Sequence, residues 1–219
     1  MRESIRQFVE IVADTLPVEE PIYEFGALQL PGFAEFADLR SFFRGKSYVG
    51  CDMRGGAGVD KVLNLHSLEL PDESVGTVIT CDTLEHVEFP HKALSEIHRV
   101  LKPGGMVVLS TVLDFRIHDS PADYWRFTPD GLRSVLRPFS FVFVGSAGRT
   151  SFPHTVIAVA VKNHRDKGPS LDQFLLRFER WQKTWKNPKG KSWKDTVYLF
   201  IPPILLGLDR RIARLLKKS

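Results

Sequence analysis

Residues 76–111 read GTVITCDTLEHVEFPHKALSEIHRVLKPGGMVVLST, and this stretch decides the fold. Residues 76–81 and 106–111 are short apolar runs typical of buried strands. Between them, residues 91–101 carry apolar side chains at helical spacing, and the sequence KPGG that follows is a helix-stop signal. Strand, helix and strand in this order favour an α/β fold.

The same alternation continues on both sides of this stretch. We expect further strands at residues 21–25, 48–51, 61–63, 139–144 and 155–161, and helices at residues 4–15, 32–43 and 128–136, the last with Thr128 as N-cap and Pro129 at the first helical position. No helical pattern separates the last two strands, which predicts an antiparallel hairpin at one edge. The sequence therefore predicts a doubly wound, seven-stranded α/β sheet.

Charge divides the chain into two regions. Residues 1–161 carry 15 Lys and Arg against 21 Asp and Glu, whereas residues 162–219 carry 15 against 5. Three of the four tryptophans, Trp181, Trp185 and Trp193, fall in the second region. With 43% hydrophobic and 26% charged residues, the chain is neither disordered nor disulfide-stapled. We expect an α/β domain over residues 1–161 and a basic, Trp-rich helical extension over residues 162–219.

The expected strands end at residues suited to ligand binding. In doubly wound sheets, ligands bind at the carboxyl ends of the strands, near the point where the strand order reverses. Gly26, Asp52, Asn64, Asp82 and Thr111 lie at or just after strand ends. We therefore expect a ligand site at that edge of the sheet.

Residues 48–136 resemble class I S-adenosylmethionine-dependent methyltransferases, of the methyltransferase type 11-like kind. The pieces YVGCDM (48–53), LEHV (84–87) and RVLKPGG (99–105) carry the resemblance, which spans roughly residues 20–161. It implies a Rossmann-like sheet with S-adenosylmethionine as cofactor. It also implies methyl transfer to an oxygen or nitrogen acceptor of a small molecule, a sugar or a lipid-linked intermediate.

The resemblance assigns eight residues to the cofactor. Asp52 would accept hydrogen bonds from both ribose hydroxyls, and Met53 would lie against the adenine. Glu24 matches the acidic residue that opens the family's first motif. The full set is Glu24, Gly26, Asp52, Met53, Asn64, Leu65, Cys81 and Asp82. Other interpretations stay open: Asp52 as a solvated turn residue, Met53 at the edge of the core, and Asn64 as a loop cap.

The segment after the fifth strand is expected to form the acceptor side. His86, His118 and Asp123 are candidates for proton transfer, and Tyr124 and Arg126 are candidates for binding the substrate. The alternatives are structural: His86 packs at a helix end and Asp123 pairs with Arg126. No metal site is expected.

The first glycine motif departs from the family pattern. Gly26 is followed by the next glycine only at Gly32, where the family usually clusters three. An alternative function is therefore a non-catalytic methyltransferase-fold module that only binds its ligand.

The extension and the cysteines lead to further expectations. Residues 171–185 and 209–218 are basic amphipathic helices, suited to packing on the domain or a homodimer partner, or to an anionic membrane surface through residues 171–219. Nucleic acid is the least favoured partner. No signal-peptide pattern is present, so we expect a cytoplasmic protein, peripheral at the membrane if the extension binds lipid. In the strand order that the resemblance implies, Cys51 and Cys81 lie on strands two spacings apart, about 10 Å, which predicts free thiols.

Overall fold

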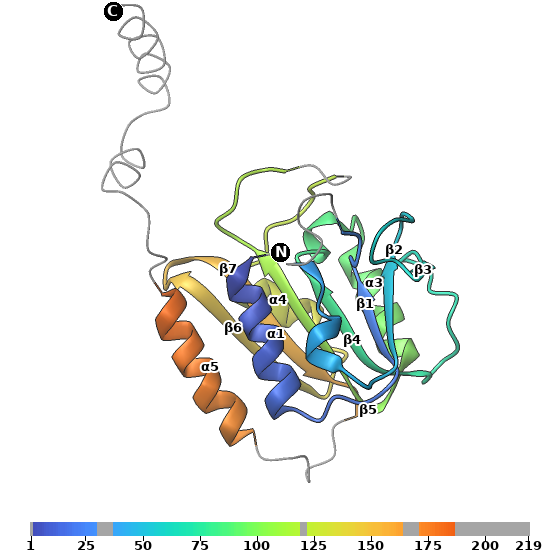
Figure 1. Ribbon diagram of the computed structural model, residues 1–219. Coiled ribbons are helices and arrows are strands. Elements are labelled where there is room, and N and C mark those ends of the chain that lie inside the picture. Colours follow the sequence, from blue (N-terminus) through green and yellow to red (C-terminus); the bar gives the residue numbers. More distant parts are fainter. Residues whose placement is uncertain (1, 30–36, 119–121, 164–170, 187–219) are drawn as a thin grey trace, which may run out of the picture. The chain divides into compact units, whose positions relative to one another are not determined.

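Within the described residues the sheet has seven strands, as predicted, and their spatial order is β3-β2-β1-β4-β5-β7-β6. The computed structural model describes residues 2–29, 37–118, 122–163 and 171–186 (Figure 1). The strands are β1 (Ile22–Phe25), β2 (Tyr48–Asp52), β3 (Lys61–Val62), β4 (Val75–Cys81), β5 (Leu101–Val112), β6 (Phe141–Arg149) and β7 (Phe152–Val161). β7 runs antiparallel to both β5 and β6, whereas the other pairs are parallel. The doubly wound sheet with an antiparallel edge hairpin is confirmed.

Helices cover both faces of the sheet, so two apolar cores form. α3 (Pro90–Val100) and α4 (Pro129–Val135) pack on one face, and α1 (Glu3–Thr15) and α5 (Asp172–Trp185) pack on the other. Figure 1 shows α1 and α5 side by side in front of the sheet. The central strand β4 is buried along nearly its whole length, because apolar side chains on both of its faces meet helices.

The strand order brings the expected ligand-binding residues to one edge. β1 lies between β2 and β4, and Phe25 at its end is in register with Cys51 and with Thr80. The strand order reverses between β1 and β4, so their carboxyl ends splay apart there. Gly26 and Asp82 follow β1 and β4, Asp52 is the last residue of β2, and all three lie at that edge.

Several element bounds differ from those expected. β5 begins at Leu101 because the KPGG segment bulges out of the ladder: Val75 pairs with Leu101, whereas Thr77 pairs with Met106. The β6–β7 hairpin is longer than its apolar runs, because backbone pairing continues through polar and glycine residues to Arg149 and Phe152. Of the helix expected at 32–43, the structure describes the 3-10 helix η1 (Arg40–Phe43), and residues 30–36 lie outside the described residues.

The first compact unit runs from Met1 to Lys186 and includes α5, which the charge pattern assigned to the extension. Phe174, Phe178 and Trp181 of α5 are buried against the sheet and α1. This helix therefore packs on the domain, as one of the alternatives proposed. The expected helix at 209–218 lies outside the described residues. Among the helices that the structure describes, none is long and apolar enough to cross a membrane.

Both cysteines are free thiols, as predicted. They lie on β2 and β4, with β1 between them. Two strand spacings exceed the span of a disulfide.

Candidate cofactor and acceptor pocket

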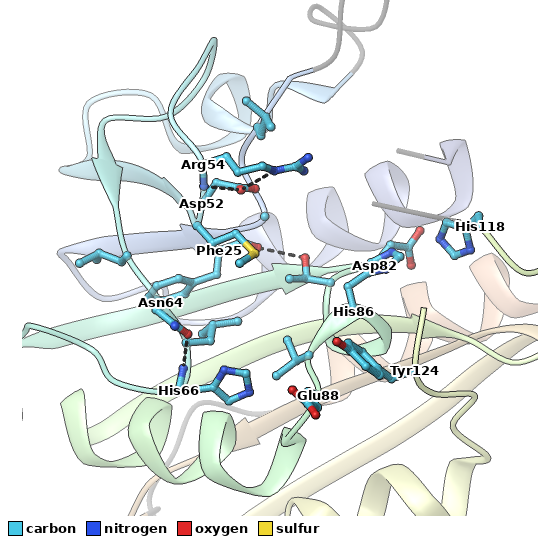
Figure 2. Close-up of a pocket in the computed structure, with 17 residues that line it drawn as sticks. Phe25, Asp52, Arg54, Asn64, His66, Asp82, His86, Glu88, His118 and Tyr124 are labelled. Atoms are coloured by element: carbon cyan, nitrogen blue, oxygen red, sulfur yellow. Dashed lines mark hydrogen bonds and ion pairs between the residues drawn. The ribbon is translucent and has the colours of Figure 1, made fainter. Parts of the chain in front are cut away.

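A pocket of about 530 Å³ lies at the carboxyl ends of β1, β2 and β4. Its wall contains most of the predicted site residues: Gly26, Asp52, Met53, Asn64, Leu65, Asp82, His86, His118 and Tyr124. Figure 2 shows Asp52, Arg54 and Asn64 toward one end, and Asp82, His86, His118 and Tyr124 toward the other. The pocket therefore has two ends with different polar groups.

At Gly26 the backbone approaches the next strand end too closely for a side chain. Gly26 has a φ of +88°, and a Cβ atom there would lie 2.2 Å from the Thr83 hydroxyl oxygen. That hydroxyl is held between the carbonyl oxygens of Phe25 and Cys81, at 3.2 and 3.1 Å. The positive φ favours glycine, and the close approach of Thr83 leaves no room for a Cβ atom. At this position the pocket wall therefore consists of backbone alone.

Asp52 ends β2 with its carboxylate held in place. Its Oδ1 accepts a hydrogen bond of 3.0 Å from the Arg54 backbone N–H, and the Arg54 Nε lies 3.7 Å away. The Asp52 side chain is only 11% exposed, whereas the neighbouring Met53 is 56% exposed. An oriented carboxylate and an apolar side chain therefore project from the same turn.

Asn64 caps its own loop. Its Oδ1 accepts a hydrogen bond of 2.9 Å from the His66 N–H, and its backbone bridges to Ser67. The structure thus shows the loop-capping arrangement, with Asn64 still part of the pocket wall. Leu65 beside it is buried in the same wall.

At the other end, Asp82 is paired with a residue from the chain's N-terminal region. The Arg2 guanidinium donates to both Asp82 oxygens, at 2.9 and 3.2 Å, and the Ser110 hydroxyl donates at 2.9 Å. Arg2 also donates to the Thr155 hydroxyl at 2.6 Å. Asp82 has a φ of +48°, which aspartate tolerates better than most residues. The start of α1 is thereby tied to the ends of β4 and β7.

Glu85 lies fully buried behind this end of the pocket. Its Oε2 accepts a hydrogen bond of 3.0 Å from the Thr111 hydroxyl. Its backbone carbonyl accepts hydrogen bonds from Tyr124 and Trp125, which holds the loop after β5 against η2 (Leu84–His86). Burial, and then the nearby Asp82 carboxylate, raise the pKa of Glu85 to about 8.

Asp123 and Arg126 form a partly buried ion pair, the Asp123–Arg126 brace, and neither residue lines the pocket. The Arg126 guanidinium donates to both Asp123 oxygens and to the carbonyls of Phe115 and Arg116. Arg126 holds the pKa of the Asp123 carboxyl well below its usual range. Asp123 also accepts a hydrogen bond of 2.8 Å from the His118 N–H. The structure thus shows the pairing alternative for these two residues.

Glu24 and Cys81 also lie outside the pocket wall. Glu24 is 5% exposed and its carboxylate accepts a hydrogen bond of 2.7 Å from the Tyr48 hydroxyl. Burial raises the pKa of Glu24 to about 7. Cys81 packs against the core cluster under α1. The side chains of Glu24 on β1 and Cys81 on β4 point to the opposite face of the sheet from Phe25.

Comparison with known proteins adds an independent observation. Residues 42–109 match the family model described as "Methyltransferase domain". The ubiquinone biosynthesis O-methyltransferase of Pseudomonas aeruginosa is 37% identical over 86 residues, which cover 32% of this chain and 36% of the relative. The match thus spans about a third of that curated relative.

Solved structures show the same fold over a longer stretch. An S-adenosylmethionine-dependent methyltransferase from Archaeoglobus fulgidus superimposes with a TM-score of 0.57 at 15% identity, over 74% of this chain and 95% of the other. The Burkholderia thailandensis 1,6-didemethyltoxoflavin-N1-methyltransferase, solved with S-adenosylhomocysteine, gives 0.56 at 14% identity, over 74% and 79%. Residues 42–109 of this chain thus match a methyltransferase domain, and the chain has the fold of S-adenosylmethionine-dependent methyltransferases. The domain match and the shared fold support the predicted resemblance, which implies S-adenosylmethionine as the cofactor.

The pocket of this methyltransferase domain suits that cofactor. Its volume of about 530 Å³ lies within the usual range for small-ligand sites. It combines a bare glycine turn at Gly26, an oriented carboxylate at Asp52 and apolar surface from Met53 and Leu65. These groups match a ligand with a ribose and a flat base.

Among the residues that sequence reasoning missed, Arg2 and Thr83 hold the strand ends that form the pocket wall. Arg2 has no local signal, because its partner Asp82 is 80 residues away. Thr83 follows a strand end, and only the close approach to Gly26 reveals its role.

Proposed function

We propose that this domain transfers a methyl group from S-adenosylmethionine to an oxygen or nitrogen atom of a small-molecule or lipid-linked acceptor. The observation that carries the proposal is the single pocket wall formed by Asp52 and Met53 at one end and His86, His118 and Tyr124 at the other. The partial match to an O-methyltransferase supports an oxygen acceptor.

The residues at the first end would hold the cofactor. Asp52 would accept the ribose hydroxyl hydrogens, Met53 and Leu65 would contact the adenine, and the backbone at Gly26 would pass close to the cofactor. Asn64 would contribute its side-chain NH₂, since its oxygen already accepts the His66 N–H. Bound S-adenosylmethionine supplies an electrophilic methyl group. We place Glu24 as a positioning residue, held by Tyr48 beneath the glycine turn.

The residues at the second end would hold the acceptor. His86 and His118 face the pocket and are the groups that can receive an acceptor proton, and Tyr124 supplies binding surface. Methyl transfer depends mainly on in-line positioning of the two reacting atoms. The Asp123–Arg126 brace, which orients the His118 loop, therefore contributes through geometry rather than as a base.

The first prediction concerns Asp52. Asp52→Ala should weaken S-adenosylmethionine binding by about 10-fold to 100-fold, since a hydrogen bond to a charged group contributes roughly 1.5–3 kcal/mol. Isothermal titration calorimetry measures the dissociation constant directly. Asp130→Ala is the matched control, because Asp130 is 96% exposed at the start of α4. Equal affinity of both variants would remove the ribose assignment. Absence of binding by the unmodified chain at millimolar cofactor would contradict the proposed activity.

The extension offers a second prediction. If residues 187–219 bind anionic lipid, the full chain should co-sediment with vesicles containing phosphatidylserine, and a chain ending at Lys186 should stay in the supernatant. This end point keeps α5, which packs on the domain. Equal sedimentation of the two chains would contradict a membrane-surface role for the extension, and with it the peripheral location.

A further inference from the structure

Three side chains of metal-binding type meet at the acceptor end of the pocket. Glu85, His86 and His118 each offer one ligand atom, and these atoms lie within 4.8 Å of one another. The rings of His86 and His118 meet edge to face, with centroids 4.7 Å apart. Both histidines line the pocket, as Figure 2 shows, whereas Glu85 lies behind the wall. The cluster therefore borders open volume on one side.

One atom of this cluster is buried without a hydrogen-bond partner. Glu85 is fully buried, and its Oε2 accepts the Thr111 hydroxyl hydrogen at 3.0 Å. Its Oε1 accepts no hydrogen bond from any residue that the structure describes. A buried oxygen without a partner is unfavourable in a folded protein and calls for a ligand. A cation held between Glu85 and the two imidazoles would satisfy it.

Both imidazoles are oriented through the same nitrogen. The Nδ1 of His86 is 2.5 Å from the Ala122 carbonyl oxygen, and the Nδ1 of His118 is 3.1 Å from Asp123 Oδ2 and 3.2 Å from the Arg116 carbonyl oxygen. With these acceptors, Nδ1 carries the proton and Nε2 keeps its lone pair. Metal-binding histidines are oriented in this way, by a carbonyl or carboxylate on the nitrogen that does not bind metal.

We propose that Glu85, His86 and His118 form a divalent-cation site that takes Zn²⁺. Two imidazoles and one carboxylate are a donor set of catalytic zinc sites, which keep one coordination position open. The open position would face the pocket, where an acceptor oxygen would occupy it. The inference rests on the proposed function only in placing the acceptor there. A bound cation would lower the pKa of an acceptor hydroxyl that coordinates it, and the proton would pass to solvent water at the open side of the pocket. In this arrangement the two histidines would hold the cation in place of receiving the proton.

The test is direct binding of Zn²⁺ to the full chain, freed of metal by dialysis against a chelator. Competition with a chromophoric chelator should show one Zn²⁺ bound per chain. Removing a residue that only orients a metal ligand lowers metal affinity roughly 10-fold to 100-fold. His118→Ala removes a ligand itself, so it should lower the Zn²⁺ affinity by more than that. His91→Ala is the matched control, because His91 is exposed on α3, outside the pocket wall, and should leave the affinity unchanged.

A second variant keeps the test valid if a ligand substitution disturbs folding. Glu85→Gln preserves the shape and an acceptor for Thr111 but removes the charge, and it should also weaken Zn²⁺ binding. Circular dichroism shows whether each variant is folded. Failure to bind Zn²⁺, or equal affinity of folded His118→Ala and His91→Ala variants, would overturn the site. S-adenosylmethionine titrations of the same sample separate this outcome from failure of the proposed function, because the cofactor end contains none of the three residues.

Discussion

Replacing Trp181 with alanine is expected to lower the free energy of unfolding by about 3–5 kcal/mol, the usual cost of truncating a buried tryptophan. Trp181 is 3% exposed on α5, and its ring lies 5.9 Å from that of Phe8 on α1 and 5.4 Å from that of Phe178. Its indole N–H donates a buried hydrogen bond of 2.7 Å to the Ser4 carbonyl. The substitution would thus create a cavity and leave a buried carbonyl without its donor.

Urea denaturation followed by circular dichroism measures this effect. Trp181→Phe keeps most of the ring and loses the hydrogen bond, so it should cost less than Trp181→Ala. Leu176→Ala, on the same helix at a side chain 54% exposed, should change the stability by no more than about 0.5 kcal/mol. If Trp181→Ala were as mild as Leu176→Ala, α5 would not be an integral part of the domain.

Replacing Glu24 with glutamine is expected to stabilise the protein by up to about 3 kcal/mol above pH 7, and to do so in a pH-dependent way. Burial raises the pKa of Glu24 from 4.5 to about 7, partly offset by the Tyr48 hydrogen bond and the Arg40 charge, while Asp38 raises it further. Folding therefore favours the neutral carboxyl. The stability from this group is fully present below about pH 4.5 and declines as the pH rises toward 7.

The measured quantity is the difference in unfolding free energy between Glu24→Gln and the unmodified protein, taken at several pH values. The Gln oxygen can still accept the Tyr48 hydroxyl hydrogen, and any fixed cost of the amide is the same at every pH. The difference should grow between pH 4.5 and 7 and then level off. Glu69→Gln, at an exposed glutamate, should show little difference across this range. A pH-independent difference for Glu24→Gln would show that folding does not raise the pKa of Glu24.

Local patterns were sufficient to predict the elements that build the sheet. The apolar run at residues 76–81 and the helical spacing at 91–101 correspond to β4 and α3 within one residue. The capping pattern at Thr128 was equally informative, since its hydroxyl accepts the Gly131 N–H at 3.0 Å. Such patterns succeed because burial of alternating or periodic side chains and the satisfaction of helix ends depend on neighbours in the chain.

Charge patterning by itself did not show where α5 packs. Its basic residues suggested part of a separate extension, yet Phe174, Phe178 and Trp181 are buried against the domain. The helix can do both because its two faces differ: the apolar face packs on α1 and β6, and the basic face stays in solvent. Net charge over a segment carries no information on which face is covered.

The sequence by itself determined the α/β architecture, the residues at the strand ends and the free state of the thiols. Tertiary structure alone decided how those residues are used. It brought Arg2 to Asp82, turned Glu24 and Cys81 away from the pocket wall, and paired Asp123 with Arg126. It also assembled Glu85, His86 and His118 around one unpartnered oxygen. The physical reason is that a strand end is specified by the residues beside it, whereas a partner across the pocket depends on the packing of elements far apart in the chain.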